Sequence, residues 1–197
     1  MKKMSKILYK IIFLFFVLYS FETNSKIVSV GNPKSKVTIK VFSSLTCPAC
    51  ADFHSKVFYQ LKEEFIDKGV VKFEHHPFPL DLAALNAEII LRCHVNNDKK
   101  FELLGKIYKK QKLWAVGSDI NKINESIKKI GLESDLKNEK MNVCLEDEKA
   151  QDEILNLRID AQKKYKINAT PTIFINEKKY TGKTDYKEFR KVLEKNL

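Results

Sequence analysis

The sequence has 197 residues, of which 44% are hydrophobic, and this length and composition suit one folded domain with a sizeable core. The formal net charge of +11 comes mainly from lysines in every segment, and the arginines are only Arg92, Arg158 and Arg190. Because nucleic-acid recognition favours the bidentate guanidinium group, this composition excludes nucleic acid as the expected partner.

The first 25 residues predict an export signal. Four lysines precede an apolar run over residues 11–21, which is shorter than the ~20 residues that a membrane span needs. We expect residues 1–25 to be a signal peptide cleaved after Ser25, and the protein to be periplasmic or otherwise extracytoplasmic; an uncleaved membrane anchor is the alternative. Removing this segment leaves 32 basic and 24 acidic residues, a net charge of +8.

The segment after the signal predicts strands around one helix. Residues 26–30 and 37–42 are rich in strand-forming residues and are separated by the turn Gly31-Asn32-Pro33. Apolar residues at near-helical spacing predict a helix that begins at Pro48 and ends by Gly69. Residues 70–75 alternate between apolar and polar side chains and predict another strand. The buried face of the helix is expected to contain Phe53, Val57, Leu61 and Phe65.

Residues 81–166 predict a block of helices, with candidates at 81–96, 98–112, 119–130 and 146–166. Ser118 is the expected N-cap of the third helix, whose isoleucines form one apolar stripe. The fourth helix has acidic residues at its start and lysines at its end, which suits the helix dipole. This block indicates a helical subdomain inserted into an α/β domain.

Strand character returns near the C-terminus. Residues 172–175 and 179–181 predict a hairpin, and a final helix follows Gly182. We therefore divide the mature chain into a first α/β part at residues 26–80, a helical insertion at 81–166 and a second α/β part at 167–197. The buried face of the last helix is expected to contain Tyr186, Phe189, Val192 and Leu193.

The sequence Cys47-Pro48-Ala49-Cys50 at the start of a helix is suited to disulfide exchange. Unpaired backbone N–H groups and the helix dipole stabilise a thiolate at Cys47, and Cys50, one turn later, can resolve the mixed disulfide. Zinc would need a second cluster of ligands, and a structural disulfide across so short a loop gains little stability. We expect a redox-active disulfide, with no metal and no other cofactor.

A second motif, Thr170-Pro171, precedes the apolar strand at residues 172–175. Together with the upstream cysteine pair, this position predicts a cis peptide bond near the cysteines. There the backbone of Thr170 can hydrogen-bond an extended polypeptide. We expect Pro48 and Ala49 to contact the substrate with Thr170 and Pro171.

Three segments, GNPKSKVTIKVFSSLTCPACADFH, FPLDLAALNAEIILRC and ATPTIFIN, resemble the DsbA-type branch of the thioredoxin superfamily. The resemblance implies a thioredoxin fold, a central mixed sheet flanked by helices, with an inserted helical subdomain. It also implies an exposed nucleophile at Cys47, a resolving thiol at Cys50 and a cis-proline at Pro171. The implied activity is oxidation of unfolded or extended exported polypeptides by a monomer, with a quinone-linked, DsbB-like membrane oxidase restoring the disulfide.

Some residues depart from the family pattern. Ala49 stands where the family dipeptide has histidine, so we expect a less oxidising pair. Val41 occupies the place of a buried glutamate that relays protons in relatives, and Glu74 or His75 are candidates to replace it. Thr170 before the proline resembles the disulfide-isomerase branch.

The remaining cysteines, Cys93 and Cys144, lie in the predicted insertion. An even number of cysteines in an exported chain favours disulfides, and this pair would close a loop of about fifty residues. We expect a structural disulfide here; two free buried thiols are the alternative.

These features favour a disulfide-forming oxidase. The alternatives are a periplasmic reductase or isomerase with the same chemistry, and a binding or chaperone module that keeps the fold without catalysis.

Overall fold

The computed structural model describes residues 27–197, so the expected signal peptide lies outside the described residues. Within these residues a five-stranded mixed sheet has the order β1-β3-β2-β4-β5. β2 and β3 run parallel, whereas the other neighbours are antiparallel. The predicted mixed sheet flanked by helices is therefore confirmed. Its strands are β1 (Val28–Val30), β2 (Val37–Ser43), β3 (Val71–Pro77), β4 (Thr172–Ile175) and β5 (Lys178–Lys179).

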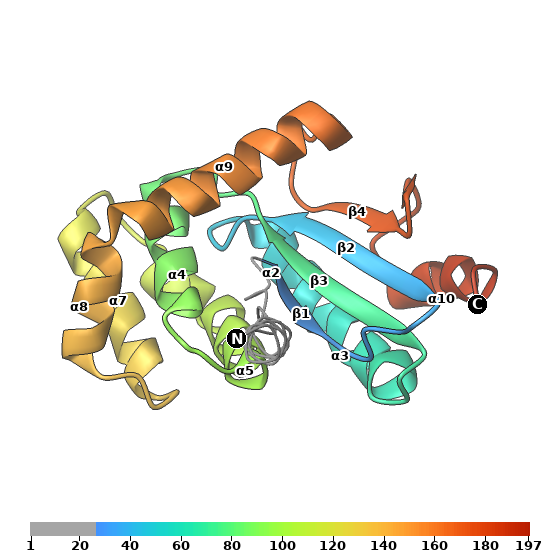
Figure 1. Cartoon of the computed structure of the whole chain (residues 1–197), viewed down its shortest axis with the longest axis horizontal. Coiled ribbons are helices and arrows are strands. Elements are labelled where there is room, and N and C mark those ends of the chain that lie inside the picture. Colours follow the sequence, from blue (N-terminus) through green and yellow to red (C-terminus); the bar gives the residue numbers. More distant parts are fainter. Residues whose placement is uncertain (1–26) are drawn as a thin grey trace, which may run out of the picture.

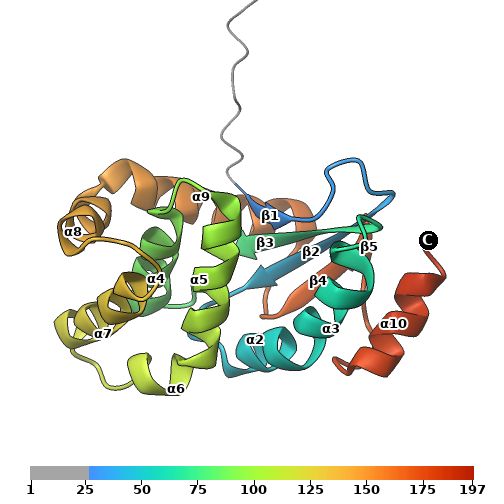
Figure 2. The same ribbon diagram turned by 90° about the horizontal axis from the view of Figure 1, so that it is seen from below.

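The helices lie around this sheet as Figures 1 and 2 show, with α4, α5, α7 and α8 gathered at one end and α10 at the other. A continuous helical segment follows β2 and consists of α2 (Pro48–Phe53), η1 (His54–Phe58), α3 (Tyr59–Leu61) and η2 (Lys62–Ile66). The later helices are α4 (Leu82–Arg92), α5 (Asn97–Lys109), α6 (Gln111–Trp114), α7 (Ile120–Leu132), α8 (Asn138–Glu146), α9 (Glu148–Tyr165) and α10 (Tyr186–Glu194).

The two faces of the sheet are covered by different helices. Ile39 and Phe73 pair in the parallel register and belong to the main core, which includes the helical segment after β2 and the buried face of α10. Phe42 and Phe174 point to the opposite face and pack with Ala161 of α9. Because side chains alternate along a strand, each residue of β2 and β3 is directed to one of these two layers.

Four local predictions were wrong. The N-cap of α7 is Asp119, not Ser118, because the Asp119 carboxylate accepts hydrogen bonds from two backbone N–H groups. α8 was not predicted as a separate helix. β5 spans Lys178–Lys179, whereas the prediction was 179–181. It begins one residue early because Asn176, with a positive φ of 53°, lies in a short hairpin turn that places Lys178 opposite Ile175. Val192 is 36% exposed, so the core face of α10 is formed by Phe189 and Leu193.

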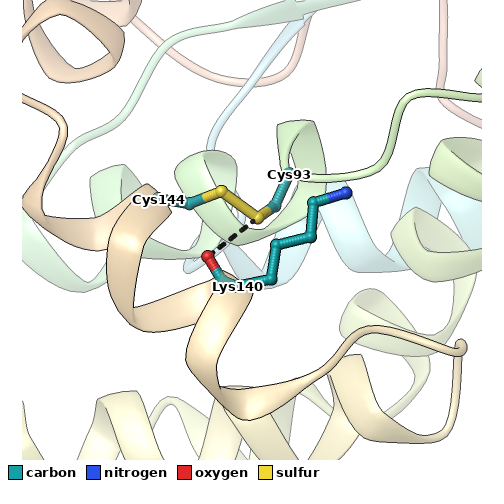
Figure 3. The surroundings of a disulfide bond; sticks show 3 residues. All are labelled: Cys93, Lys140 and Cys144. Carbon is teal, nitrogen blue, oxygen red and sulfur yellow. Dashed lines mark hydrogen bonds between the residues drawn. A yellow bond between two sulfur atoms is a disulfide. The ribbon is translucent and has the colours of Figure 1, made fainter.

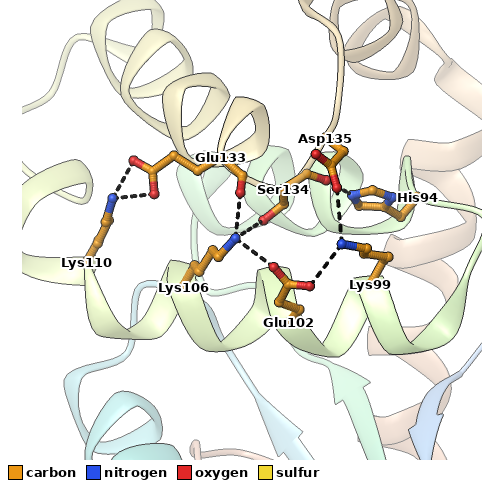
Figure 4. A network of polar contacts seen from close by, with 8 residues as sticks. All are labelled: His94, Lys99, Glu102, Lys106, Lys110, Glu133, Ser134 and Asp135. Carbon is orange, nitrogen blue, oxygen red and sulfur yellow. Dashed lines mark hydrogen bonds and ion pairs between the residues drawn. The ribbon is translucent and has the colours of Figure 1, made fainter.

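A polar network joins α5 to the segment after α7, as Figure 4 shows. Lys106 donates to the Glu133 carbonyl oxygen and to Ser134 Oγ, while His94 Nε2 lies 2.6 Å from the Ser134 carbonyl oxygen. Exposed ion pairs of this kind contribute little individually, but the bonds to backbone carbonyls fix the loop. The other residues of this polar network are Lys99, Glu102, Lys110 and Asp135.

In residues 27–197 no helix is both long enough and apolar enough to span a membrane.

Candidate active site

The loop between β2 and α2 is held from two other elements. Thr46 donates to Asp81 Oδ2 at 2.8 Å, and Asp81 also caps α4 by accepting from the Ala84 N–H. Gln111 of α6 donates to the carbonyl oxygens of Leu45 at 2.7 Å and Cys47 at 3.0 Å. These contacts fix the backbone where α2 begins, with Cys47 at the N-cap position and Pro48 in the first turn. Neither Asp81 nor Gln111 was predicted as a site residue.

Cys47 lies at the N-cap with its thiol donating to the Thr170 carbonyl oxygen, 3.4 Å away. The pKa of Cys47 is lowered to about 5, mainly because the Cys50 thiol donates a hydrogen bond to its sulfur. The Thr170 side chain and nearby backbone N–H groups lower this pKa further, whereas burial raises it. The expectation of an exposed nucleophile needs correction, because Cys47 is only 8% exposed. Thr170 is one of the residues in contact with the Cys47 sulfur.

Cys50 is more deeply placed, at 2% exposure. Burial raises the pKa of its thiol strongly, and the neighbouring Cys47 adds to this effect. The two sulfurs therefore have opposite tendencies, one toward a thiolate and the other toward a protonated thiol. This division suits a nucleophile and a resolving thiol.

The Thr170–Pro171 peptide bond is cis, and it lies beside Cys47 at the start of β4. The buried Thr170 hydroxyl has no other hydrogen-bond partner among the described residues, so it can donate to a thiolate at Cys47 and lower the pKa of that group. Pro48 and Ala49 are exposed in the first turn of α2. The structure thus brings together the two cysteines and the four residues expected to contact substrate, although these segments are far apart in the sequence.

A cleft of about 800 Å³ opens next to the cysteine pair, between α2 and α5–α6. Apolar atoms dominate its lining, and Lys109 and Lys112 stand at its rim. Among residues 27–197 no group of three or more metal-ligating side chains is present.

Cys93 and Cys144 form a disulfide with a Cα–Cα distance of 6.0 Å, which joins the end of α4 to α8. Figure 3 shows the bridge, with the Cys93 sulfur 3.5 Å from the Lys140 carbonyl oxygen. The structure places this pair within the helical part of the chain, while Cys47 and Cys50 are free thiols.

The two candidates for a replacement acid lie on opposite faces of β3. Glu74 faces the α9 layer, where it pairs with Lys72 at 2.7 Å and His76 at 2.9 Å, away from the cysteines. His75 faces the main core and lies 2.5 Å from Glu88 of α4, which is 0% exposed. Glu88 was not predicted as a site residue, because a single acidic residue in a helical pattern usually faces solvent.

One measurement checks the cause of the low pKa at Cys47. In Thr170→Val the hydroxyl that faces Cys47 is lost, so we expect the thiolate to form at higher pH than in wild type, by roughly one pKa unit. Titrating the ultraviolet absorbance of the thiolate in the reduced proteins gives both values. Ser55→Val, on the exposed side of η1, is the control and should titrate like wild type.

The fold, the two free thiols and the cis-proline beside them define a protein with the thioredoxin fold and a dithiol site. The chain belongs to the thioredoxin family, because the family model described as thioredoxin matches residues 23–195.

Named relatives are consistent with this assignment. The chain is 31% identical to disulfide bond formation protein D of Bacillus subtilis over 178 residues, 85% of this chain and 76% of that protein. It is 30% identical to a putative protein-disulfide oxidoreductase of Rickettsia bellii, covering 80% of this chain but only 60% of that longer protein. The crystal structure of alpha-DsbA1 from Wolbachia pipientis superposes with a TM-score of 0.79 and 29% identity, over 87% of this chain and 90% of that one.

Proposed function

We propose that this chain is an exported protein-disulfide oxidoreductase that introduces disulfide bonds into extended polypeptides outside the cytoplasm. The observation that carries the proposal is the contrast within Cys47-Pro48-Ala49-Cys50. The pKa of Cys47 is lowered to about 5, whereas burial raises that of Cys50. The low pKa makes Cys47 a good leaving group, which destabilises the disulfide relative to the dithiol.

The reaction begins when a substrate thiolate attacks Cys47 in the Cys47–Cys50 disulfide. Cys50 leaves with the electron pair of the broken S–S bond and takes up a proton, and Cys47 is joined to the substrate. A second substrate thiolate then attacks the substrate sulfur, which releases Cys47 as a thiolate and leaves the substrate oxidised. A quinone-linked membrane oxidase would remove the two electrons from the reduced pair.

The site also supports a mode of substrate binding. An extended segment of substrate can pair with the backbone at Thr170, beside the Cys47 sulfur, as a strand added to an edge. The exposed Pro48 and Ala49 and the adjacent cleft would contact its side chains. We therefore propose unfolded or extended polypeptides, rather than small thiols, as substrates of a monomer.

The reduction potential tests the direction. Nucleophile pKa values of about 7 in thioredoxin and about 3.5 in DsbA accompany potentials of about −270 and −120 mV, so a pKa near 5 predicts roughly −200 mV. Equilibration with glutathione measures it. A potential near that of thioredoxin would instead favour a reductase or isomerase, the direction suggested by Thr170 before the cis-proline.

The pH dependence of the potential supplies a second readout of the same experiment. Above about pH 5 the reduced pair holds one thiolate and one thiol, so reduction consumes one proton and the potential falls by about 30 mV per pH unit. Below that pH two protons are consumed and the slope doubles. A single steep slope through neutral pH would contradict the assigned pKa.

A further inference from the structure

The cleft next to the cysteine pair lies between α2 and the junction of α5 with α6. Pro48 and Ala49, which follow Cys47 in the chain, line one side of it. Gln111 lines the other side, and its side chain donates to the Cys47 carbonyl oxygen at 3.0 Å. A polypeptide that is joined to Cys47 by a disulfide therefore has this cleft directly beside it.

The lysines at the α5–α6 junction fall into two groups. Lys110 pairs with the Glu133 carboxylate, and Lys106 donates to the Glu133 carbonyl oxygen, so both are directed to the loop after α7, as Figure 4 shows. Lys109 and Lys112 line the cleft instead, and both are exposed. Neither has an ion-pair or hydrogen-bond partner among residues 27–197. Their positive charge is thus available to a molecule bound in the cleft.

The other titratable groups of the cleft do not cancel this charge. Asp52 is the acidic residue of the lining, and its carboxylate pairs with the Lys56 ammonium group at 2.9 Å, so the two together carry no net charge. His54 is buried, and burial lowers its pKa to about 3, so its ring is neutral near neutral pH. The cleft is therefore mainly apolar in its lining and positive at its rim.

The cleft continues along α5 into a second hollow of about 580 Å³. The two hollows share three lining residues, which are Tyr59, Gly105 and Lys109. Apart from Lys109, the charged residues of the second hollow are two lysines and three acids, which leave no net positive charge there. Together the hollows form an elongated groove, a shape that suits an extended polypeptide, and its positive charge is confined to the part beside Cys47.

We propose that Lys109 and Lys112 determine substrate specificity by favouring polypeptides with acidic side chains close to the reacting cysteine, a role that rests on the proposed function. While the polypeptide is bonded to Cys47, a carboxylate a few residues from that bond lies in the cleft against the two ammonium groups. A neutral residue at the same place lacks this attraction, and a lysine is repelled. Exposed charges of this kind affect the rate of association and the choice of partner more than the final affinity.

Three peptides test this selectivity. Each has one cysteine activated as a neutral 2-pyridyl disulfide, with glutamate, glutamine or lysine two residues away on both sides. The Cys47 thiolate of the reduced protein attacks the peptide sulfur and forms a Cys47–peptide disulfide, while the pyridyl sulfur leaves with the electron pair, takes up a proton and absorbs as 2-thiopyridone. Dividing each second-order rate constant by that for mercaptoethanol removes the intrinsic reactivity of the peptide. At low salt we expect the glutamate peptide to react roughly tenfold faster than the lysine peptide, with the glutamine peptide between them.

Variants of the two lysines separate this effect from the overall charge of the protein. In Lys109→Gln with Lys112→Gln, the rates for the glutamate and lysine peptides should come within about twofold of each other. This ratio does not depend on the reactivity of Cys47, because both peptides react with the same thiolate. Reversing the charges with Lys109→Glu and Lys112→Glu should make the lysine peptide the faster one. The matched control is Lys178→Gln with Lys179→Gln, which removes the same charge from β5, opposite the end of β4 farther from Cys47, and should keep the wild-type preference.

Salt provides an independent readout, because the Debye length falls from about 10 Å at 0.1 M to about 3 Å at 1 M. The preference of the wild type for the glutamate peptide should therefore disappear at high salt. Equal rates for the three peptides in wild type, or a preference that persists in Lys109→Gln with Lys112→Gln, would overturn the proposal and leave the proposed function intact. A wild type that reacts with none of the peptides faster than mercaptoethanol does would contradict the proposed function itself.

Discussion

Cys47→Ser is expected to reduce disulfide exchange with a peptide substrate by roughly three orders of magnitude or more, because a serine hydroxyl cannot replace a thiolate near neutral pH. Cys50→Ser should behave differently. Its Cys47 can still attack a disulfide, and the new hydroxyl can still donate to that sulfur. Without a resolving thiol, the mixed disulfide with the substrate should accumulate and persist.

Mass spectrometry of the protein after incubation with a peptide disulfide measures both outcomes. Cys50→Ser should carry one peptide per chain, released by reducing agent, and Cys47→Ser should carry none. A stable adduct on Cys50 in Cys47→Ser would show that the buried thiol is accessible, against its 2% exposure and raised pKa. The peptide lacking its disulfide serves as the control for non-covalent binding.

Local sequence patterns were sufficient for the parts of the site that lie on single elements. Pro48 in the first turn after a strand indicated a cysteine pair at a helix start, and Pro171 before an apolar strand indicated the second segment. Their meeting across 123 residues depends on β2 and β4 being neighbours in the sheet. The order of the predicted elements along the sequence favoured that pairing but did not determine it.

The parts that were missed depend on contacts between elements. Gln111 follows two lysines and has no local signal, yet it donates to the carbonyl oxygens of Leu45 and Cys47. From the sequence alone, Glu88 in an apolar helix is expected to face solvent. The structure shows that it is instead in contact with His75 of β3. Polar residues that are buried in pairs cannot be recognised one at a time, since burial is favourable only when the partner is present.

The structure shows which residues lie next to Val41, where the family resemblance led us to look for a buried acid. Val41 pairs in register with His75 across the parallel strands β2 and β3, on the same face of the sheet. The core position that an acid would occupy is therefore apolar, and the polar group is on the neighbouring strand. His75 then needs its own partner, which α4 supplies as Glu88. The buried polar pair in this part of the core is thus formed by β3 and α4, and β2 contributes an apolar residue to it.

Removing the second disulfide should have the largest effect on stability. The Cys93–Cys144 bridge joins residues separated by 51 positions, and loop closure of that size stabilises the fold by about 4 kcal/mol in the chain-entropy model. The double variant Cys93→Ala, Cys144→Ala should therefore melt about 8–16 °C below wild type, given roughly 2–4 °C per kcal/mol for a domain of this size.

Thermal unfolding followed by circular dichroism, with Cys47 and Cys50 oxidised in both proteins, measures this difference. Val143→Ala is a matched control, because Val143 neighbours Cys144 on α8 but is 68% exposed, and it should change the melting temperature little. A loss below about 1 kcal/mol in the double variant would mean that the unfolded chain is already restricted in this region, so that the bridge removes little of its entropy. The polar network that binds α5 to the loop after α7 lies within the loop that the disulfide closes, so it could supply such residual order.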